Sequence, residues 1–547
     1  MRLFPEPRKI IKCGGTCEKN TRVEAFLVES GLPPQGYRLT IGPKRITLEG
    51  ADSAGLFYGG QTVEQILSQA DGEALPCLEV QDWPDFRRRA YMLDISRDRV
   101  PTMVQLFHLI DQLAALRYNE LQLYTEHSFA YAQHPVVWQK ASPMKPEELR
   151  ELDHYSRERK IELIPNQNSF GHMERWLQHP EYHHLAECPN GFAHPLGGWR
   201  EHGSVLRPEA ASLDFLDGLY RELLPNFTSK RFNIGGDEPW ELGQGATRSR
   251  VEREGKYPVY LDFLSQVCRL AENYGVEPMC WADVLLESPE AVRALPSGIT
   301  PILWGYEVEH PFDKQCELLA GLDRNFYVAP GDSTWNSHTG RGDVMAQNIR
   351  AAAVSGLRHG AAGFMLAHWG DGGHPQPWVV GLPGMVWGGL NAWNVEAAEQ
   401  GFSAAMEFAL DESDRPKQLA ELLRRAGQLD AALQCPLPNK SFLAHSLHLN
   451  EVALRAFEPK PSEKNLRQQI VDCDSLLNSC GEDGLSEELA LALRMNRFAA
   501  YRCLGELDQR QGRYENLVID FKKQWLRRSR EGGLKDSLGR MPGLTAL

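Results

Sequence analysis

The chain has 547 residues and a formal net charge of −14, because 73 Asp and Glu side chains outnumber 59 Lys and Arg. That balance argues against a nucleic-acid partner, since no basic excess is present to neutralise phosphates. The length predicts roughly two to four domains. Hydrophobic residues make up 42% and charged residues 24%, which is typical of a globular enzyme-sized protein acting on a neutral or small substrate.

Eleven Cys residues form no regular framework, and the close pair Cys13 and Cys17 is too little for a zinc ribbon or a disulfide scaffold. We therefore expect reduced thiols and a cytoplasmic location. The N-terminal residues lack the apolar run of a signal peptide, although a chain with its leader removed would look the same. No segment approaches the ~20 apolar residues that span a bilayer, so we expect no membrane partner.

Residues 1–84 are predicted to form a small α+β domain. Tyr37–Ile41 and Arg45–Glu49 alternate apolar and polar residues, as half-buried strands do, and Gly42-Pro43 marks the turn between them. Ser53 to Leu67 has the apolar face of a helix. The boundary of this domain is expected near Asp82 to Asp85.

Residues 85–400 alternate short apolar runs with helical patterns, which indicates βα units around a parallel sheet. The candidate strands are Ala90–Ile95, Glu120–Tyr124, Glu162–Pro165, Arg231–Ile234, Glu277–Trp281, Pro301–Trp304, Phe326–Ala329 and Gly363–His368. The candidate helices between and after them include Val104–Leu116, Pro258–Asn273, Val344–His359 and Gly384–Ala398. Eight such units predict an α/β fold of the (β/α)8 TIM-barrel type. A doubly wound open sheet is the alternative, but no GxGxxG fingerprint supports it.

Residues 401–547 are predicted to form a C-terminal α-helical domain without strands. The helical patterns are Gln418–Ala426, Ser462–Asn478, Glu487–Gly505 and Tyr514–Arg528. An exposed apolar face on these helices would allow a homodimer. We assign no site residue to this part of the chain.

Two adjacent carboxylates, Asp237 and Glu238, form the most informative motif. They follow the short apolar strand Arg231–Ile234 and the glycines Gly235 and Gly236, and Trp240 comes just after them. Glycines let backbone and ligand approach closely because no Cβ intervenes. Two neighbouring acids repel each other, so a fold keeps them together only with compensation, often at a working site. The alternative is a solvated Asp-Glu turn.

Polar and aromatic residues also follow the other candidate strands, and in a barrel these ends meet at one face. They are Asp94 and Arg97, Asn166, Asn168 and His172, Trp281 and Asp283, Trp304, Tyr327 with Asp332 and Trp335, and Trp369 with Asp371. Each is weak evidence alone, and Asp94 is equally well explained as a buried structural acid. Together they predict a pocket with an aromatic box, paired acids, an Arg, a His and a distal acid.

Such a pocket suits a neutral sugar. Thirteen Trp residues offer flat apolar faces on which sugar rings stack, although Trp also fills cores. Arg97 and Asp371 are expected to hydrogen-bond hydroxyls. Glu238 is the candidate general acid, because a neighbouring Asp237 and Trp walls would raise its pKa.

These motifs resemble those of glycoside hydrolase family 20, the β-N-acetylhexosaminidases, in a bacterial type with C-terminal helices. Asn233 to Glu238 (Asn-Ile-Gly-Gly-Asp-Glu) is similar to the acid-pair motif of the family. Leu93 to Arg97 resembles its first-strand motif, whose Arg holds sugar hydroxyls, and Phe170-Gly171-His172 its Gly-His loop. Gly55 to Thr62 resembles part of the small domain that precedes the barrel. The similarity covers residues from about 20 to 398.

The resemblance implies an exo-acting hydrolase for terminal β-linked GlcNAc or GalNAc that needs no cofactor. The 2-acetamido oxygen of the substrate would attack the anomeric carbon and give an oxazolinium intermediate with retention, so the family is an exception to the two-carboxylate rule. Asp237 would orient the acetamido group, and Glu238 would act as acid and then as base. The residues that would bind the substrate are Arg97, His172, Trp281, Trp304, Tyr327, Trp369 and Asp371. Tyr327 is the nearest counterpart of the family's acetamido-binding Tyr, and Trp335-Asn336 is the alternative occupant of that space. In the motif that contains Asp371 the family commonly has a longer acid.

Three alternatives stay open. A retaining glycosidase with two protein carboxylates would use Glu238 and Asp283. A sugar-binding protein on an inactive barrel would bind without turnover. A metal site is suggested by His179, His183, His184 and Cys188, but no His-Glu-x-x-His signature accompanies them, and we expect no metal.

Overall fold

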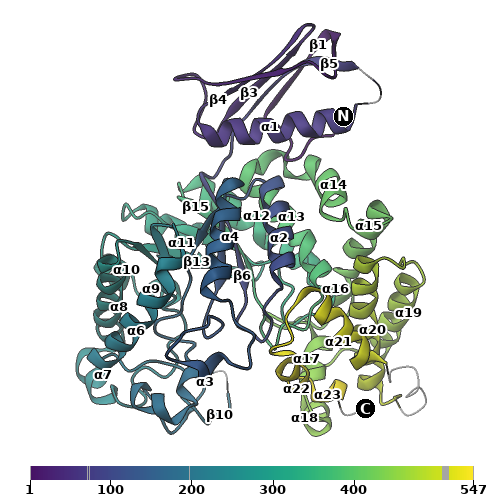
Figure 1. Cartoon of the computed structure of the whole chain (residues 1–547). Coiled ribbons are helices and arrows are strands. Elements are labelled where there is room, and N and C mark those ends of the chain that lie inside the picture. The colour runs from purple at the N-terminus through teal and green to yellow at the C-terminus, as the bar shows by residue number, and fades with distance from the viewer. Residues whose placement is uncertain (1, 71, 73, 196, 508–515, 546–547) are drawn as a thin grey trace.

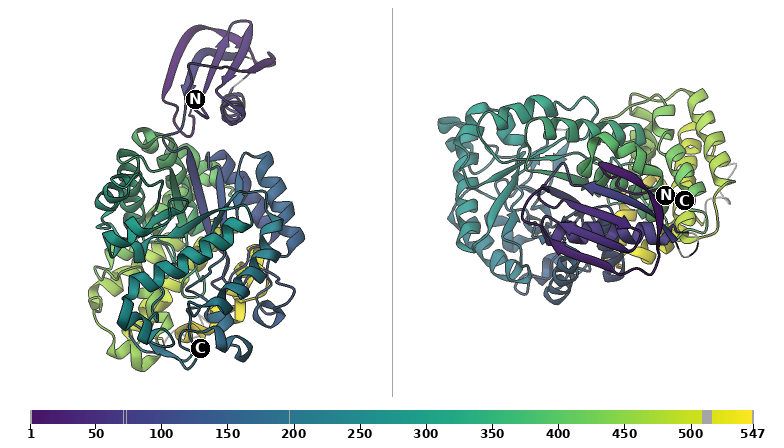
Figure 2. Two further views of the ribbon diagram at one scale, coloured as in Figure 1. Left: turned by 90° about the vertical axis from the view of Figure 1, so that its left-hand side faces the viewer. Right: turned by 90° about the horizontal axis from the view of Figure 1, so that it is seen from above.

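The computed structural model describes residues 2–70, 72, 74–195, 197–507 and 516–545. Figure 1 shows a small sheet with one helix, a barrel of strands ringed by helices, and a group of helices beside the barrel. The small sheet covers one end of the barrel, and helices α17, α18, α22 and α23 lie near the opposite end (Figure 1; Figure 2, left).

The N-terminal unit is a five-stranded sheet with a helix on one face. The strand order is β1-β5-β3-β4-β2, with β2 parallel to β4 and the other neighbours antiparallel. The elements are β1 (Lys9–Glu18), β2 (Val23–Leu27), β3 (Tyr37–Gly42), β4 (Arg45–Gly50), α1 (Ser53–Ser68) and β5 (Ala74–Asp82). The predicted small α+β unit is confirmed, but β1, β2 and β5 were not predicted. Strand β1 is mostly exposed and its register shifts between Lys12 and Thr16, so it carries no clean alternation.

Eight parallel strands form the barrel in the order β11-β12-β13-β14-β15-β6-β7-β8. They are β6 (Arg88–Asp94), β7 (Glu120–Tyr124), β8 (Glu162–Ile164), β11 (Arg231–Asn233), β12 (Glu277–Trp281), β13 (Thr300–Trp304), β14 (Tyr327–Ala329) and β15 (Gly363–His368). The outer strands meet where Asn166 pairs with Asn233, and the backbone N of Asn233 donates to the carbonyl of Pro165 at 2.9 Å. The barrel is therefore closed, as predicted, and the open doubly wound sheet is wrong.

Helices follow the strands and surround the barrel. They are α2 (Met103–Ala115), α3 (Pro135–Trp138), α4 (Pro146–Glu158), α5 (Glu174–Leu177), α6 (Ala210–Leu223), α7 (Arg248–Glu254), α8 (Lys256–Asn273), α9 (Asp283–Leu286), α10 (Pro289–Ala294), α11 (Phe312–Ala320), α12 (Gly342–Arg358) and α13 (Leu382–Trp393), with the short strands β9 (Phe192–Ala193) and β10 (Trp199–Arg200) and the 3-10 turns η1 (Pro180–Leu185), η2 (Leu224–Asn226), η3 (Trp378–Gly381) and η4 (Val395–Ala397). The predicted helix Gly384–Ala398 is too long, because Asn394 has an extended backbone with φ −146° and ends α13.

Alternate strand residues pack in two cores, because successive side chains point to opposite faces of a strand. Met92 belongs to the cluster inside the barrel, whereas Leu93 belongs to the cluster between strands and helices. Trp281, the last residue of β12, lies in the inner cluster. The C-terminal end of the barrel interior is therefore lined by large aromatic side chains.

The C-terminal region is helical in its described part. Its helices are α14 (Ala398–Ala409), α15 (Pro416–Ala426), α16 (Leu429–Ala432), α17 (Phe442–His448), α18 (Glu451–Ala456), α19 (Glu463–Leu477), α20 (Gly484–Leu504), α21 (Leu517–Arg528), α22 (Leu534–Gly539) and α23 (Pro542–Thr545). Tyr514, the predicted start of the last long helix, lies outside the described residues.

The segment after α21 is fixed to the loop that follows β6. The backbone N of Thr102 donates to the carbonyl of Arg528 at 3.0 Å, and the backbone N of Arg530 donates to Val100 at 2.8 Å. Nε of Arg540 lies 2.6 Å from Oδ2 of Asp98. The C-terminal helices thus hold the loop that carries Arg97. None of the helices in the described ranges combines the length and apolar composition needed to cross a bilayer.

Candidate active site

A pocket opens at the C-terminal end of the barrel strands. Its volume is about 470 Å³ when the open solvent at its mouth is included. Its lining residues are Arg97, His172, Asp237, Glu238, Trp281, Trp304, Tyr306, Trp335, Trp369, Asp371 and Asn439. The structure thus brings together all of the residues expected to act in catalysis or to bind substrate, except Tyr327. Asn166, Asn168 and Asp332, which were also expected at this face, do not line the pocket.

Two glycines shape the loop that carries the acid pair. Gly235 and Gly236 have φ of 76° and 93°, in the left-handed region that favours glycine. A Cβ on Gly235 would also lie 1.7 Å from Oδ1 of Asn168, so no side chain fits there. Glu238 has φ 46°, which is uncommon for a residue with a side chain. The loop therefore turns sharply and presents both carboxyl groups to the pocket.

Asp237 is held on one side only. Its Oδ2 lies 3.1 Å from Nε2 of His172, whereas its Oδ1 is buried and has no hydrogen-bond partner. The residue is 6% exposed. A buried carboxylate oxygen without a partner is costly, so a ligand that donates a hydrogen bond here would be favoured.

Glu238 is the more accessible acid, with a side chain that is 31% exposed. Burial raises its pKa, and the nearby Asp237 and Asp371 carboxylates raise it further, while His172 and Arg97 lower it. A carboxyl group with a raised pKa can hold a proton closer to neutral pH, which is what a general acid requires.

His172 lies between the acid pair and Arg97. Burial alone would lower its pKa, but the Asp237 carboxylate outweighs that effect and the pKa rises to about 9. Nδ1 of His172 lies 3.4 Å from Nη2 of Arg97. The preceding Gly171 contacts the acid-pair loop so closely that a Cβ there would lie 2.5 Å from the carbonyl oxygen of Asp237.

Arg97 is fixed by acids and aromatic rings. Its Nη1 lies 3.3 Å from Oδ2 of Asp94, and its Nη2 lies 3.2 Å from Oε1 of Glu126. The guanidinium carbon lies 4.5 Å from the ring centre of Tyr124 and 5.0 Å from that of Trp369. Arg97 is therefore positioned before any substrate binds.

Asp94 is a buried structural acid, which was the alternative interpretation given to it from the sequence. It is fully buried, and its Oδ1 accepts from the backbone N of Ser96 and Arg97 at 2.8 and 3.1 Å. Its Oδ2 accepts from the backbone N of Gly370 at 2.9 Å. This joins the Arg97 loop to the loop that carries Asp371. Burial raises the pKa of Asp371, while Arg97 opposes that rise.

The aromatic walls form a connected group. Trp281 and Trp369 have ring centres 5.7 Å apart, and Trp304 stacks on Tyr306 at 5.2 Å. Nε1 of Trp369 donates to the hydroxyl of Tyr306 at 2.8 Å. Tyr306 also meets Trp335 edge-on at 4.9 Å. Flat apolar faces therefore surround the acid pair.

Asp283 lies behind the acid pair and does not line the pocket. Its Oδ2 accepts from the backbone N of Glu238 at 3.0 Å, and its Oδ1 accepts from Nε1 of Trp304 at 3.3 Å. Burial and the nearby Asp237 raise its pKa to about 7. Asp283 thus supports two pocket residues.

The prediction that Tyr327 binds substrate is wrong. Tyr327 is the first residue of β14, so its side chain lies toward the N-terminal end of the barrel. Its hydroxyl hydrogen-bonds Nη1 of Arg231 at 2.6 Å and Oε2 of Glu120 at 3.1 Å. Those partners are also the first residues of their strands. Tyr327 therefore belongs to an ion-pair network at the opposite end.

Three lining residues were not assigned to the site from the sequence. Tyr306 comes two residues after β13, so looking for aromatic residues just after each strand would have found it. Trp335 follows β14 at some distance; it was expected at this face as an alternative to Tyr327, but it was not among the assigned substrate-binding residues. Asn439 comes from the C-terminal region, to which no site residue had been assigned, and no sequence signal pointed to it.

The histidines near residue 180 do not gather around a metal position. Within the described ranges, no three His, Cys, Asp or Glu side chains are placed to hold a metal ion. His183 lies near His202, with ring centres 6.4 Å apart.

An aromatic pocket with paired carboxylates at this end of a (β/α)8 barrel places the protein in the class of glycoside hydrolases. Comparison with known families narrows the class. Residues 14–83 match the family description "Glycosyl hydrolase family 20, domain 2", and residues 86–350 match "Glycosyl hydrolase family 20, catalytic domain". The chain belongs to glycoside hydrolase family 20.

Characterised relatives are distant. Hexosaminidase D of Homo sapiens is 28% identical over 237 residues, which cover 41% of this chain and 46% of that protein. A beta-hexosaminidase of Akkermansia muciniphila is 25% identical over 277 residues, which cover 46% of this chain and 56% of that protein. The chain spans about half the length of the curated relatives it matches.

Solved structures show the same fold. The Flavobacterium johnsoniae chitobiase has a TM-score of 0.62 at 15% identity, and the match covers 98% of each chain. The beta-N-acetylhexosaminidase from Bacteroides fragilis has a TM-score of 0.55 at 19% identity, covering 72% of this chain and 90% of that one.

Proposed function

We propose that this protein is an exo-acting β-N-acetylhexosaminidase that removes terminal β-linked GlcNAc or GalNAc with retention of configuration. Family membership and hexosaminidase relatives support the activity. The natural substrate would be a small glycan or glycoconjugate with such a terminal sugar.

The free oxygen of Asp237 carries this proposal. One carboxylate oxygen is engaged by His172, and the other is buried in the pocket without a partner. The N–H of a 2-acetamido group is a donor that would satisfy it. A plain glucoside has a hydroxyl at that position and no amide that could serve as a nucleophile.

In the proposed mechanism the acetamido oxygen of the substrate attacks the anomeric carbon while Glu238 protonates the leaving glycosidic oxygen. The attack is intramolecular, so the pocket only has to align the acetamido oxygen with the anomeric carbon and does not have to bind a separate nucleophile. Asp237 holds the amide N–H and balances the positive charge that develops on the oxazolinium ring. Glu238, now ionised, then activates the water that opens this ring and regenerates the acetamido group.

The remaining lining residues would bind the sugar. Arg97 and Asp371 would hydrogen-bond ring hydroxyls, and Trp281, Trp304 and Trp369 would enclose the ring and the acetamido methyl group. Tyr306 replaces Tyr327 as the tyrosine proposed to donate to the acetamido oxygen. Its oxygen already accepts from Trp369, which leaves its own O–H free to donate.

The geometry of Asp283 disfavours the mechanism with two protein carboxylates. Both of its oxygens accept hydrogen bonds, from the Glu238 backbone and from Trp304, and it does not line the pocket. A nucleophile must reach the anomeric carbon. Asp283 would have to lose both contacts to do so.

The test compares p-nitrophenyl glycosides of GlcNAc, GalNAc and glucose, with an oxazoline-mimicking inhibitor in parallel. We expect turnover of the N-acetylated substrates, at least ~100-fold slower turnover of the glucoside, and competitive inhibition by the mimic. Faster cleavage of the glucoside would instead support the two-carboxylate enzyme. Binding of GlcNAc without any turnover would support the inactive sugar-binding protein.

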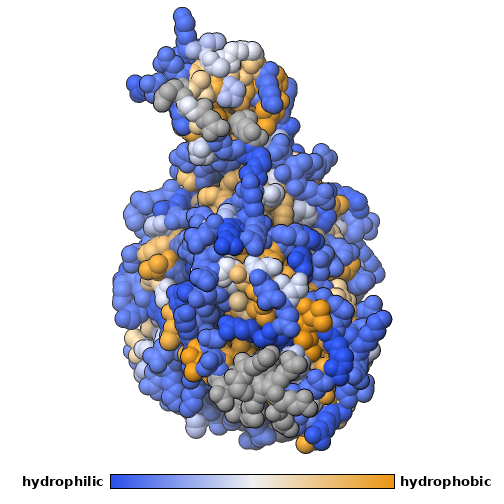
Figure 3. Space-filling model, turned by 90° about the vertical axis from the view of Figure 1, so that its right-hand side faces the viewer, coloured by the Kyte–Doolittle hydropathy of each residue, from blue (hydrophilic) through white to orange (hydrophobic). Residues whose placement is uncertain are grey.

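The homodimer was expected from an exposed apolar face on the C-terminal helices. Exposed apolar side chains on the C-terminal helices include Val452, Val471 and Ile519, at 79%, 59% and 61% exposure. They lie on three different helices. Figure 3 shows a largely hydrophilic surface with scattered hydrophobic patches on the side that includes these helices. The homodimer and the cytoplasmic location remain predictions.

A further inference from the structure

One residue of the C-terminal region reaches the pocket. Asn439 lies in the connection between α16 and α17, and it lines the cavity together with the barrel residues. The matched catalytic domain ends at residue 350, so this part of the wall comes from outside it.

The turn that presents Asn439 is well defined. Leu437 and Lys440 form an antiparallel bridge, and Asn439 between them has φ 55°. Asn tolerates this left-handed conformation better than most residues with a side chain. The backbone therefore suits an Asn at the tip of the turn.

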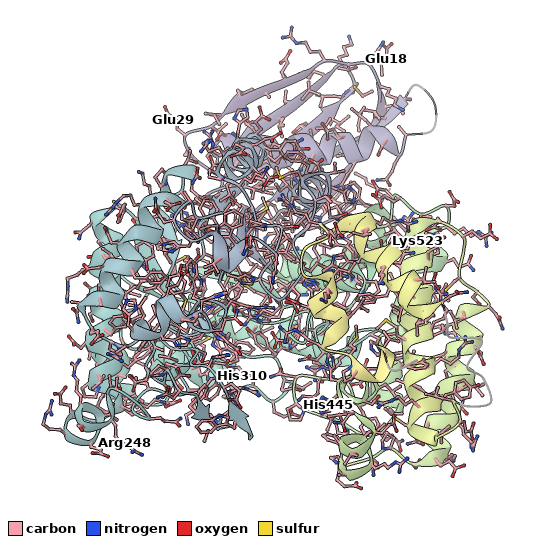
Figure 4. The ribbon with its side chains drawn as sticks, turned by 60° about the horizontal axis from the view of Figure 1, so that its bottom comes forward. Glu18, Glu29, Arg248, His310, His445 and Lys523 are labelled. Atoms are coloured by element: carbon pink, nitrogen blue, oxygen red, sulfur yellow. The ribbon has the colours of Figure 1, made fainter. Side chains whose placement is uncertain are left out.

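Two hydrogen bonds fasten this turn to loops that carry pocket aromatics. The backbone N of Asn439 donates to Oε1 of Glu307 at 2.6 Å, and the backbone N of Ser441 donates to the carbonyl of Asn336 at 2.9 Å. Glu307 directly follows Tyr306, and Asn336 directly follows Trp335. Figure 4, with this end of the barrel turned toward the viewer, labels His310 in the loop after β13 and His445 in α17, the two segments that flank this turn.

Glu307 is itself anchored. Its carboxylate lies 3.0 Å from Nη1 of Arg341, which is 4% exposed. A charge-assisted pair of this kind has little freedom to move. The Asn439 turn is thus attached to a fixed point of the barrel.

The Asn439 side chain can hydrogen-bond a ligand. Its Oδ1 is buried and has no hydrogen-bond partner in the structure. A side-chain amide offers both an acceptor and two donors, which matches a sugar hydroxyl that donates and accepts. A charged or apolar ligand group would not pair with both the acceptor and the donors of this amide.

We propose that Asn439 is a specificity-determining residue that hydrogen-bonds a ring hydroxyl of the terminal N-acetylhexosamine. The C-terminal helical region thereby takes part in substrate recognition. This inference rests on the proposed hexosaminidase function and adds a binding group that the barrel alone does not supply.

The test uses Asn439→Gly, which removes the amide and keeps the left-handed turn, and Asn439→Asp, which keeps the acceptor oxygen and replaces the two N–H donors by a second acceptor oxygen. Gln434→Gly is the matched control, because Gln434 is an exposed amide in the same connection with φ 54°. Each protein is assayed on aryl GlcNAc and on its 3-, 4- and 6-deoxy analogues. We expect Asn439→Gly to lower kcat/KM on the parent about 5- to 10-fold, with Asn439→Asp intermediate and Gln434→Gly unchanged.

The deoxy analogues separate recognition from a structural role. Wild type should hydrolyse each deoxy analogue more slowly than aryl GlcNAc. Asn439→Gly should hydrolyse the analogue that lacks the contacted hydroxyl as fast as wild type does, because the contact is already absent. An equal loss by Asn439→Gly on every substrate, or no loss at all, would overturn the inference. If wild type does not hydrolyse aryl GlcNAc, the proposed hexosaminidase function fails instead. Asn439 is then judged by calorimetric binding of GlcNAc, where equal affinity of wild type and Asn439→Gly rejects it.

Discussion

Nε2 of His172 lies 3.1 Å from Oδ2 of Asp237 and 3.7 Å from Oε2 of the neighbouring Glu238. One imidazole therefore faces both members of the acid pair. It lowers the pKa of Glu238, whereas Asp237 raises that pKa. Burial is the largest influence on the pKa of this proposed general acid, and these two neighbours act on it in opposite directions, so replacing either one should move the pKa in a known direction.

Replacing Asp237 by Asn should lower kcat by about 100-fold or more and change KM little. Asp237 contributes most when the positive oxazolinium charge forms, which is a feature of the transition state rather than of the bound substrate. Loss of its negative charge should also lower the pKa of Glu238, so the alkaline limb of the kcat/KM profile should move to lower pH. Steady-state kinetics across pH measure both effects, and a change confined to KM would contradict this role.

Replacing His172 by Gln should move the alkaline limb of the kcat/KM profile to higher pH. The positive imidazolium lowers the pKa of Glu238, so its removal should raise that pKa and extend activity to higher pH. The maximum rate should fall about 10-fold, because Asp237 loses the partner that orients it. The comparison with Asp237→Asn serves as the control, since two shifts of the same sign would show that at least one of the two residues does not act through the pKa of Glu238.

Replacing Glu238 by Gln should abolish most turnover of substrates with poor leaving groups and spare binding. An alkyl glycoside of GlcNAc needs protonation of its leaving oxygen, whereas a dinitrophenyl glycoside needs little. The variant should therefore lose at least about 100-fold more activity on the first than on the second. Affinity for an oxazoline-mimicking inhibitor, measured in parallel, reports whether the pocket is intact. Near-normal hydrolysis of the alkyl glycoside would remove Glu238 as the acid.

The barrel was predictable because its signals are local. Each buried strand is a short apolar run, and the sequence placed Glu120–Tyr124, Glu277–Trp281 and Gly363–His368 with the observed bounds. The acid pair was predictable for the same reason, since Gly235 and Gly236 mark a turn that only glycine makes readily.

The errors have a different physical origin. Tyr327 was placed at the wrong end because three-residue strands leave little margin, and a side chain at the start of β14 lies at the opposite end from one that follows it. Asn439 reaches the pocket through tertiary packing of a segment far along the chain, held by Glu307. No spacing within the sequence encodes that contact.

Replacing Gly171 by Ala should impair both stability and rate. The added Cβ would lie 2.5 Å from the carbonyl oxygen of Asp237, and backbone on both sides cannot yield without moving the acid pair. Overpacking of this kind costs about 1–3 kcal/mol. Gly218→Ala is the control, because Gly218 lies in α6 with no atom within 4 Å of its would-be Cβ, and Ala there should be neutral or stabilising. Thermal unfolding and kcat are measured for both, and an unaffected kcat in Gly171→Ala would show that the acid pair tolerates displacement.

Two tyrosine variants should separate the pocket from the opposite end of the barrel. Tyr306→Phe removes a hydroxyl that accepts from Trp369 on a residue that lines the pocket and is proposed to contact the acetamido group, so kcat/KM should fall about 10-fold or more. Tyr327→Phe removes a buried hydroxyl from the ion-pair network of Arg231 and Glu120, and should lower the free energy of unfolding by about 1–2 kcal/mol while leaving kcat nearly unchanged. Both are single-atom deletions in buried tyrosines, so each controls for the other. Aryl GlcNAc hydrolysis and thermal unfolding are measured on the same preparations. A large kcat loss in Tyr327→Phe with a normal Tyr306→Phe would restore the assignment made from the sequence.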